Sequence, residues 1–315
     1  MRRRVGFVGL SGAAIVGFVA VVRRYWRDLA AASARLAAVD RAEITTEIGV
    51  IEYAERGEGP ALLVSHGIFH GCDGGLLAVR DVIDGRRVIV PSRFGYLGST
   101  LPPIASSATQ ADAFVELLGH LAVDEVDVIG ISAGTGAALQ LAIRHPHRVG
   151  HLVISSGNWP GSPTATAPPA WARLFYNDSA MWALKHLGGP MINRLMGVPV
   201  GFPRNDEQAD AIGELVDSIF PLEPRRPGAV FDAFVFNPEV NDLPLESIAV
   251  PTLIVHAKDD PLASFDAAAR AAERIPAAKL VGLESGGHLA LGQTQRVRSE
   301  IARFLETPNR SRSSA

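Results

Sequence analysis

Short apolar runs, separated by loops rich in glycine, proline and polar residues, recur along this chain of 315 residues. Five of these runs have the β-branched and aliphatic residues typical of buried strands: residues 61–65, 126–129, 152–156, 251–256 and 279–283. Directly after the second run, residues 135–141 have the composition of the start of a helix. The loops that follow the strands carry Gly, Ser, Asp and His, and catalytic residues are most often found on such loops.

A longer uncharged apolar stretch, residues 5–22, stands near the N-terminus between arginines at 2–4 and 23–24. These eighteen residues would span about 27 Å as a helix, close to the roughly 30 Å of a bilayer core. We therefore expect a single-pass N-terminal anchor in a lipid bilayer, with residues 1–41 forming the membrane anchor and linker. Its orientation stays open because arginines flank both ends. The alternative is a signal peptide cleaved near residues 32–34 (Ala-Ser-Ala), which would give a secreted protein.

Residues 130–134 (Gly-Ile-Ser-Ala-Gly) connect a predicted strand to a predicted helix. A serine with glycines two positions before and after it, on a strand-to-helix turn, is the nucleophile-elbow pattern. Gly130 and Gly134 are needed because the turn is too sharp for side chains there, and it leaves the Ser132 hydroxyl exposed above the sheet. The pattern predicts Ser132 as a catalytic nucleophile.

A serine hydroxyl needs a base to take its proton and an acid to orient that base. Of the nine histidines, His288 fits the base best, because it lies on a glycine-rich loop after a strand. Asp260 is the expected acid, since it follows another buried strand and directly precedes a proline that holds it extended. Asp259 is the rival for that role. The chain order Ser132, Asp260, His288 is that of an α/β-hydrolase triad.

The oxyanion that forms when a serine attacks a carbonyl needs two N–H donors. One is expected from the Ala133 amide, directly after the nucleophile. The other is expected from Ile68, because the strand at 61–65 ends in His66-Gly67-Ile68 and Gly67 lets the backbone turn its amides inward. His66 is interpreted as shaping this loop and not as a second base.

These motifs resemble those of the α/β-hydrolase fold family over about residues 43–306. The resemblance rests on five motifs in order: His66-Gly67, residues 92–99 (Ser-Arg-Phe-Gly-Tyr-Leu-Gly-Ser), the elbow, Asp260-Pro261 and Gly287-His288. It implies an α/β fold with a mostly parallel eight-stranded sheet and helices on both faces. Two positions depart from the common pattern, Ala257 where Gly is usual and Ser92 where Asp is usual. They leave the subfamily open.

The resemblance also divides the chain. Residues 42–158 and 248–306 would form the core, and residues 159–247 are far longer than the single helix that a minimal fold needs there. We expect this insertion to be a helical cap over the active site, and residues 307–315 to be a disordered tail. Six aromatic residues are candidates for lining an apolar pocket: Trp159, Trp171, Phe175, Trp182, Phe231 and Phe234.

Composition narrows the function further. The net charge of −3 gives no basic surface for nucleic acid, and the single cysteine, Cys72, cannot form an intramolecular disulfide. No metal or other cofactor is expected. Within the family that the chain resembles, Ser132 at the elbow excludes haloalkane dehalogenases and epoxide hydrolases, because these enzymes use Asp there.

We therefore expect a serine hydrolase that cleaves a carboxylic ester, or a related acyl bond, of a small apolar substrate through an acyl-enzyme. Two alternatives stay open. One is a hydrolase of carbon–carbon bonds, which the same fold supports with the same nucleophile. The other is a non-catalytic, membrane-anchored binding protein.

Overall fold

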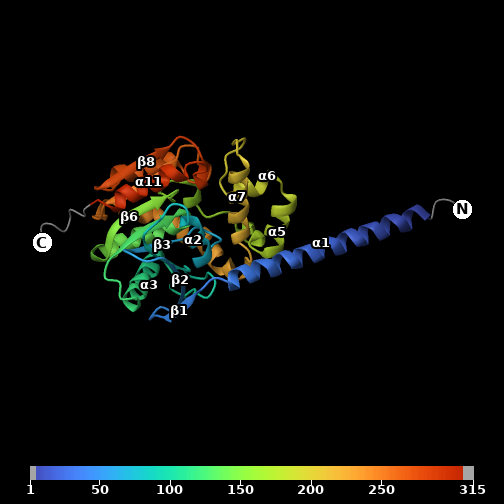
Figure 1. The fold of residues 1–315 in the computed structure, drawn as a ribbon, viewed down its shortest axis with the longest axis horizontal. Helices are drawn as coiled ribbons and strands as arrows, with labels where there is room; N and C mark the ends of the chain where they lie inside the picture. The colour runs from blue at the N-terminus through green and yellow to red at the C-terminus, as the bar shows by residue number, and fades with distance from the viewer. Residues whose placement is uncertain (1–4, 308–315) are drawn as a thin grey trace.

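Eight strands form one sheet, in the order β1-β2-β4-β3-β5-β6-β7-β8, in the computed structural model, which describes residues 5–307 (Figure 1). The strands are β1 (Ala42–Thr45), β2 (Val50–Arg56), β3 (Ala61–Ser65), β4 (Arg87–Pro91), β5 (Val126–Ile131), β6 (Val149–Ser155), β7 (Thr252–Ala257) and β8 (Ala278–Leu283). β2 runs antiparallel to β1 and β4, and the other neighbouring pairs are parallel. The prediction of a mostly parallel eight-stranded sheet is confirmed.

Helices cover both faces of this sheet. On one face lie α2 (Cys72–Val79) and α11 (Thr294–Leu305), and on the other lie α3 (Ser107–His120), α4 (Thr135–Arg144) and α10 (Phe265–Arg274). Alternate residues of β3 serve the two faces: Leu62 and Val64 pack with α2 and α11, and Leu63 packs on the opposite side. Burial on both faces explains why the strands appear in the sequence as continuous apolar runs.

The segment between β6 and β7 forms a separate helical layer, the cap, beside the sheet (Figure 1). Its helices are α5 (Asp178–Leu187), α6 (Pro190–Leu195), α7 (Asp206–Ser218), α8 (Arg226–Phe231), the π-helical turn Asp232–Phe236 and α9 (Asn237–Glu239). Backbone hydrogen bonds join it to loops after β4 and β8, from Leu97 N to Pro224 O (2.7 Å) and from His288 N to Gly197 O (2.9 Å). The cap therefore lies over the carboxyl ends of the strands.

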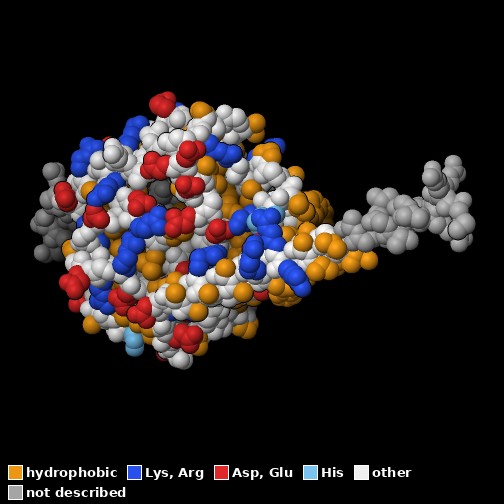
Figure 2. Space-filling view, turned by 45° about the vertical axis from the view of Figure 1, so that its right-hand side comes forward, with side chains coloured by type: hydrophobic (Ala, Val, Ile, Leu, Met, Phe, Trp, Pro, Cys, Tyr) orange, Lys and Arg blue, Asp and Glu red, His pale blue; other side chains and the backbone are white. Residues whose placement is uncertain are grey.

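The N-terminal helix α1 (Val5–Ala37) projects from the body, and its C-terminal part packs on the cap (Figure 1). Ala32 is buried in the apolar cluster of the cap. Trp182 Nε1 donates to the Asp28 carboxylate (3.1 Å), and Arg35 donates to the Asp217 carbonyl (3.1 Å). Side chains are described from residue 14 onward, and Figure 2 shows hydrophobic and basic side chains beside one another along this helix.

The predicted membrane span over residues 5–22 is wrong. Among the residues that the structure describes, no helix has both the length and the apolar character needed to cross a membrane. The helix does not end after the apolar run, but continues through Arg23, Arg24, Arg27 and Asp28 onto the cap. The predictions of bilayer contact and of a single-pass membrane location depended on this span, so they are wrong as well. The predicted tail at 307–315 lies, apart from its first residue, outside the described residues.

Candidate active site

Ser132 stands at a sharp turn between β5 and α4. Its φ of +50° is the left-handed conformation that side chains other than glycine rarely adopt. A Cβ at Gly130 would lie 2.7 Å from the Cβ of Ala138, and a Cβ at Gly134 would lie 2.1 Å from the Ser65 carbonyl oxygen. Because helix α4 and the loop after β3 both press on the turn, glycine is required on either side of the serine.

The three residues of the predicted triad meet above the carboxyl ends of the strands. Ser132 Oγ lies 2.8 Å from His288 Nε2, and His288 Nδ1 lies 2.8 Å from Asp260 Oδ2. A carboxylate can only accept, so Nδ1 carries the proton and Nε2 is left to accept from the serine hydroxyl. The loops after β5, β7 and β8 thus bring together residues that are up to 156 positions apart.

The Asp260 carboxylate is fully buried but has several donors. Its Oδ1 accepts from the amides of Leu262 (2.8 Å) and Ala263 (3.0 Å). Burial by itself raises the pKa of Asp260, but hydrogen bonds from His256 and His288 outweigh it, and the pKa falls well below its ordinary value. The carboxylate is therefore ionised at neutral pH and able to stabilise an imidazolium at His288.

The rival carboxylate, Asp259, has a different environment. It accepts from the amides of Gly286 (3.2 Å) and Gly287 (2.8 Å), which directly precede the histidine. Both glycines have positive φ, +126° and +60°, so the loop needs glycine there. Asp259 therefore holds the loop that carries His288, and does not contact its ring through any hydrogen bond found among the described residues.

The loop after β3 packs directly against the elbow. A Cβ at Gly67 would lie 3.5 Å from the Cβ of Ser132. His66 is fully buried; its Nδ1 donates to the Gly67 carbonyl (2.8 Å) and its Nε2 accepts from the Arg93 amide (3.0 Å). Burial holds the pKa of His66 well below its usual range. With both nitrogens occupied, the ring can shape the loop but cannot act as a base.

The amides of Ile68 and Ala133 lie where this loop meets the elbow. Ile68 follows Gly67, and Ala133 follows Ser132. In the part of the chain that the structure describes, neither amide has a hydrogen-bond acceptor. Two unpaired donors beside a serine hydroxyl are what an oxyanion site requires.

A buried ion pair that the sequence did not reveal links this loop to the cap. The Arg93 guanidinium binds the Asp232 carboxylate through two hydrogen bonds (2.6 and 2.5 Å), and Arg93 Nε donates to the His66 carbonyl (2.9 Å). Tyr96 also hydrogen-bonds to Asp232. Residues 92–99 could be noted as a family motif, but Asp232 lies 139 positions from Arg93, so no local spacing signals the pair.

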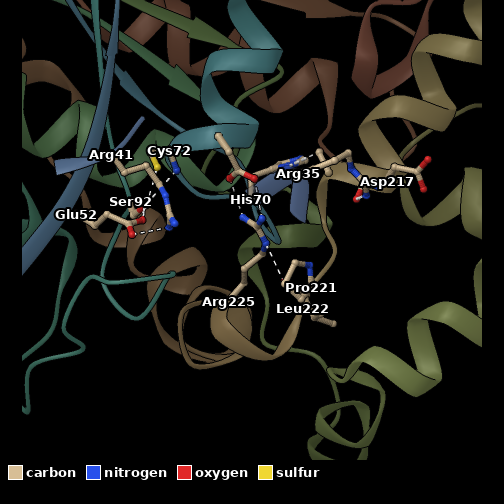
Figure 3. A network of polar contacts seen from close by, with 12 residues as sticks. Arg35, Arg41, Glu52, His70, Cys72, Ser92, Asp217, Pro221, Leu222 and Arg225 are labelled. Carbon is tan, nitrogen blue, oxygen red and sulfur yellow. Dashed lines mark hydrogen bonds and ion pairs between the residues drawn. The ribbon is translucent and has the colours of Figure 1, made fainter. Parts of the chain in front are cut away.

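A second buried arginine, Arg225 of the cap, is held near the start of α2, where this loop ends (Figure 3). Arg225 binds both carboxylate oxygens of Asp73 at the start of α2 (2.8 and 2.7 Å), and its Nε donates to the Pro221 carbonyl (3.1 Å). The Arg225 side chain is completely buried. The loop that carries Ile68 is therefore held between two arginine–aspartate pairs.

The departure at Ser92 also has a structural partner (Figure 3). Its hydroxyl donates to Glu52 (3.0 Å) and accepts from the Cys72 amide (3.1 Å), and Arg41 pairs with the same glutamate (2.8 Å). Burial raises the pKa of the Cys72 thiol to about 12. The thiol stays protonated and is unsuited to act as a nucleophile.

A cavity of about 230 Å³ opens beside His288, between the sheet, α2, α11 and cap helix α7. Most of its lining is apolar and includes Leu77, Ile131, Ile212, Leu215 and Leu291. The only lysine or arginine among its lining residues is Arg80, which pairs with Glu214 through two hydrogen bonds (2.7 and 3.0 Å). His288 is the one triad residue among the lining residues, and the walls suit an apolar group better than an anionic one.

The six aromatic residues proposed from the sequence do not line this cavity. Trp159 is fully buried in the core, and Trp171 and Phe175 are 63% and 56% exposed on the cap. Trp182 packs against α1. The other two aromatic residues are only partly buried, Phe231 against the core and Phe234 beside Arg173. The walls of the cavity beside His288 are aliphatic instead.

Comparison with known proteins gives consistent matches. A family model described as alpha/beta hydrolase fold matches residues 60–293. YcgS of Bacillus subtilis, an uncharacterized hydrolase, is 29% identical over 78% of this chain and 90% of its own length. The 2-hydroxymuconate semialdehyde hydrolase of Pseudomonas putida is 30% identical over 64% of this chain and 70% of its own. An alpha/beta hydrolase fold protein from Nakamurella multipartita has a TM-score of 0.70 at 26% identity, covering 84% of this chain and 99% of that one.

Proposed function

Because the chain belongs to the alpha/beta hydrolase fold family, as the sequence motifs predicted, we propose that it is a serine hydrolase that cleaves a carboxylic ester or a related acyl bond. The observation that carries the proposal is the unbroken series of hydrogen bonds from Asp260 through His288 to Ser132, at 2.8 Å for each step. Geometry and roles of this kind define a nucleophilic triad irrespective of sequence position.

In the first half-reaction, His288 Nε2 takes the hydroxyl proton as Ser132 Oγ attacks the substrate carbonyl carbon. The carbonyl oxygen becomes an oxyanion that accepts from the amides of Ile68 and Ala133. Asp260 stabilises the imidazolium. The bond to the leaving alcohol then breaks, and His288 gives its proton to the alcohol oxygen, which leaves an acyl-enzyme on Ser132.

Water completes the reaction by the same steps. His288 removes a proton from a water molecule as its oxygen attacks the acyl carbon, and the second oxyanion binds the same two amides. Collapse of this intermediate breaks the bond to Ser132 Oγ. The proton on His288 returns to the serine, and the carboxylic acid leaves.

We propose an apolar acyl or alcohol group for the substrate. The cavity beside His288 is mainly aliphatic, and burial of apolar surface there would favour binding by about 25 cal/mol per Å². An anionic substrate would need a free cation, but Arg80 at the cavity is already paired with Glu214. A neutral ester fits these walls better than a charged one.

The second candidate function is hydrolysis of a carbon–carbon bond. It is favoured by the similarity to 2-hydroxymuconate semialdehyde hydrolase, whose name specifies another substrate class. It would use the same nucleophile, base and oxyanion site. The lining of the cavity weighs against this second candidate. The ring-fission products of this class carry carboxylates, but Arg80 at the cavity is already paired with Glu214.

The two candidates are separated by one substrate panel. The purified full chain is assayed with p-nitrophenyl esters of increasing acyl length and with a ring-fission dienoate, and labelling by a fluorophosphonate probe reports whether the serine is activated. We expect ester turnover and labelling, both absent in Ser132→Ala. Turnover of the dienoate alone would favour the second candidate, and no labelling of the folded protein would refute both.

A further inference from the structure

A second buried histidine contacts the carboxylate of the triad. His256 is near the end of β7, four residues before Asp260, and its side chain is completely buried. Its Nε2 lies 3.2 Å from Asp260 Oδ2 and 3.0 Å from the Ala263 carbonyl oxygen. Asp260 Oδ2 is the same oxygen that accepts from His288 Nδ1. One carboxylate oxygen is therefore shared by two imidazole rings.

The surroundings fix where the proton of His256 lies. Both partners of Nε2 are acceptors, so Nε2 must carry a hydrogen to bind either of them. Nδ1 is buried and has no hydrogen-bond partner in the part of the chain that the structure describes. A proton on Nδ1 would be a buried donor without an acceptor, which is costly. The hydrogen therefore lies on Nε2, where it is shared between the Ala263 carbonyl and the Asp260 carboxylate.

From this geometry we propose that His256 is a positioning residue for the triad, which fixes the Asp260 carboxylate by donating from Nε2 to Oδ2. The inference rests on the proposed function of Ser132 and His288. Two backbone amides hold Oδ1, and His256 holds Oδ2. The carboxylate cannot rotate without breaking these bonds, so Oδ2 stays in line with His288 Nδ1.

The bond also sets how much negative charge Asp260 offers to the catalytic ring. A donor on Oδ2 draws on the same lone pairs that stabilise the imidazolium at His288. Without His256, more of this negative charge would act on the His288 ring. Loss of the donor should therefore move the acid limb of activity to higher pH while the looser carboxylate lowers the maximal rate.

In the described part of the chain, the charged groups next to this cluster lie on the loops after β7 and β8 and at the start of α10. Asp259 is bound to the loop amides before His288, and Lys258 pairs with Glu284 (2.7 Å). On α10, Asp266 lines the same shallow surface pocket as Asp260, while Phe265 contacts the His256 ring edge-on. A shift of the acid limb after a change at His256 therefore reports on the contact with Asp260.

The test measures the rate of Ser132 labelling by a fluorophosphonate, as a function of pH, in the full chain. His256→Phe keeps a ring but removes the donor, and His256→Gln places an amide N–H near the position of Nε2. The matched control is His151→Phe, because His151 is a buried histidine of β6 that binds Asp127 (2.8 Å) far from the triad. Thermal melts check that each variant is folded.

We expect His256→Phe to label about 10-fold more slowly, the lower end of the cost of losing an outer hydrogen-bond partner at metal sites. Its acid limb should lie at higher pH, and His256→Gln should recover most of the rate and the limb. His151→Phe should change the melting temperature only. A folded His256→Phe with the wild-type rate and limb overturns the inference, as does His256→Gln that matches His256→Phe in both. Absence of labelling in the wild type would instead reject the proposed function, and this inference with it.

Discussion

Asp259 and Asp260 are adjacent in the chain, but the carboxylate of Asp260 binds the His288 ring and that of Asp259 binds the backbone before it. Asp260 accepts from the His288 ring (2.8 Å), and Asp259 accepts from the two backbone amides that precede it, at Gly286 and Gly287. One carboxylate orients the base and its neighbour orients the loop that carries the base. Replacing each aspartate in turn therefore tests which of the two is the acid of the triad.

Asp260→Asn should reduce kcat on the order of 10⁴-fold, because an amide facing His288 Nδ1 favours the wrong tautomer of the ring. Asp259→Asn keeps one acceptor for the loop amides, so its loss should stay below about 100-fold. Both are measured with a p-nitrophenyl ester under saturating conditions. A larger loss for Asp259→Asn than for Asp260→Asn would mean that Asp259, and not Asp260, is the acid of the triad.

The stability of the protein should also depend on Asp260 and pH. Burial raises its pKa, but hydrogen bonds from His256 and His288 bring it below the ordinary value. An acid with a lowered folded pKa stabilises the fold above its unfolded pKa of about 3.9, and this contribution is lost as the pH falls toward the folded pKa. The melting temperature of Asp260→Asn should therefore lie furthest below wild type near neutral pH.

Thermal melts across the acid range provide the measurement. The gap between wild type and Asp260→Asn should narrow below about pH 4. Asp40→Asn, at an exposed position, is the control and should show no such gap. A gap of constant size at all pH values would mean that the ionised carboxylate does not contribute to stability.

The buried pair of Arg93 and Asp232 should dominate the attachment of the cap. Each side chain is 1% exposed, so Arg93→Met would leave an uncompensated buried carboxylate. Such losses cost about 3–5 kcal/mol, whereas replacing both partners by apolar residues is often neutral. We expect Arg93→Met to be strongly destabilised in urea unfolding and the double variant Arg93→Met/Asp232→Leu to recover most of the loss. Additive losses in the double variant would contradict this account.

The strands and the elbow could be predicted because their signals are local. The strand at residues 61–65 is β3, and the turn at Ser132 requires glycines that the sequence shows directly. Asp260 could be separated from Asp259 by its position before a proline, and the structure places it against His288. In each case the deciding information lies within a few residues.

The failures came from long-range packing. Asp232 lies far along the chain from Arg93, so their pairing has no sequence signature. His256 is part of an apolar strand, and only the folded chain brings the carboxylate of Asp260 beside its ring. The N-terminal apolar run suggested a membrane span, because nothing local shows that the same helix continues and docks on Trp182 of the cap. None of the six aromatic candidates lines the cavity beside His288, since composition does not say which face of the cap covers that cavity.

The aliphatic cavity beside His288 should determine which acyl chains are accepted. Ala211 of α7 is exposed at its mouth, so Ala211→Trp would narrow it. Ala209, also exposed on α7, borders a different groove between α1 and α2, which makes Ala209→Trp a matched control. We expect Ala211→Trp to lower kcat/KM for p-nitrophenyl octanoate on the order of 10-fold relative to the acetate, because a pocket discriminates by the methylenes it can bury. Ala209→Trp should leave this ratio unchanged, and equal effects of both variants would mean that the chain binds elsewhere.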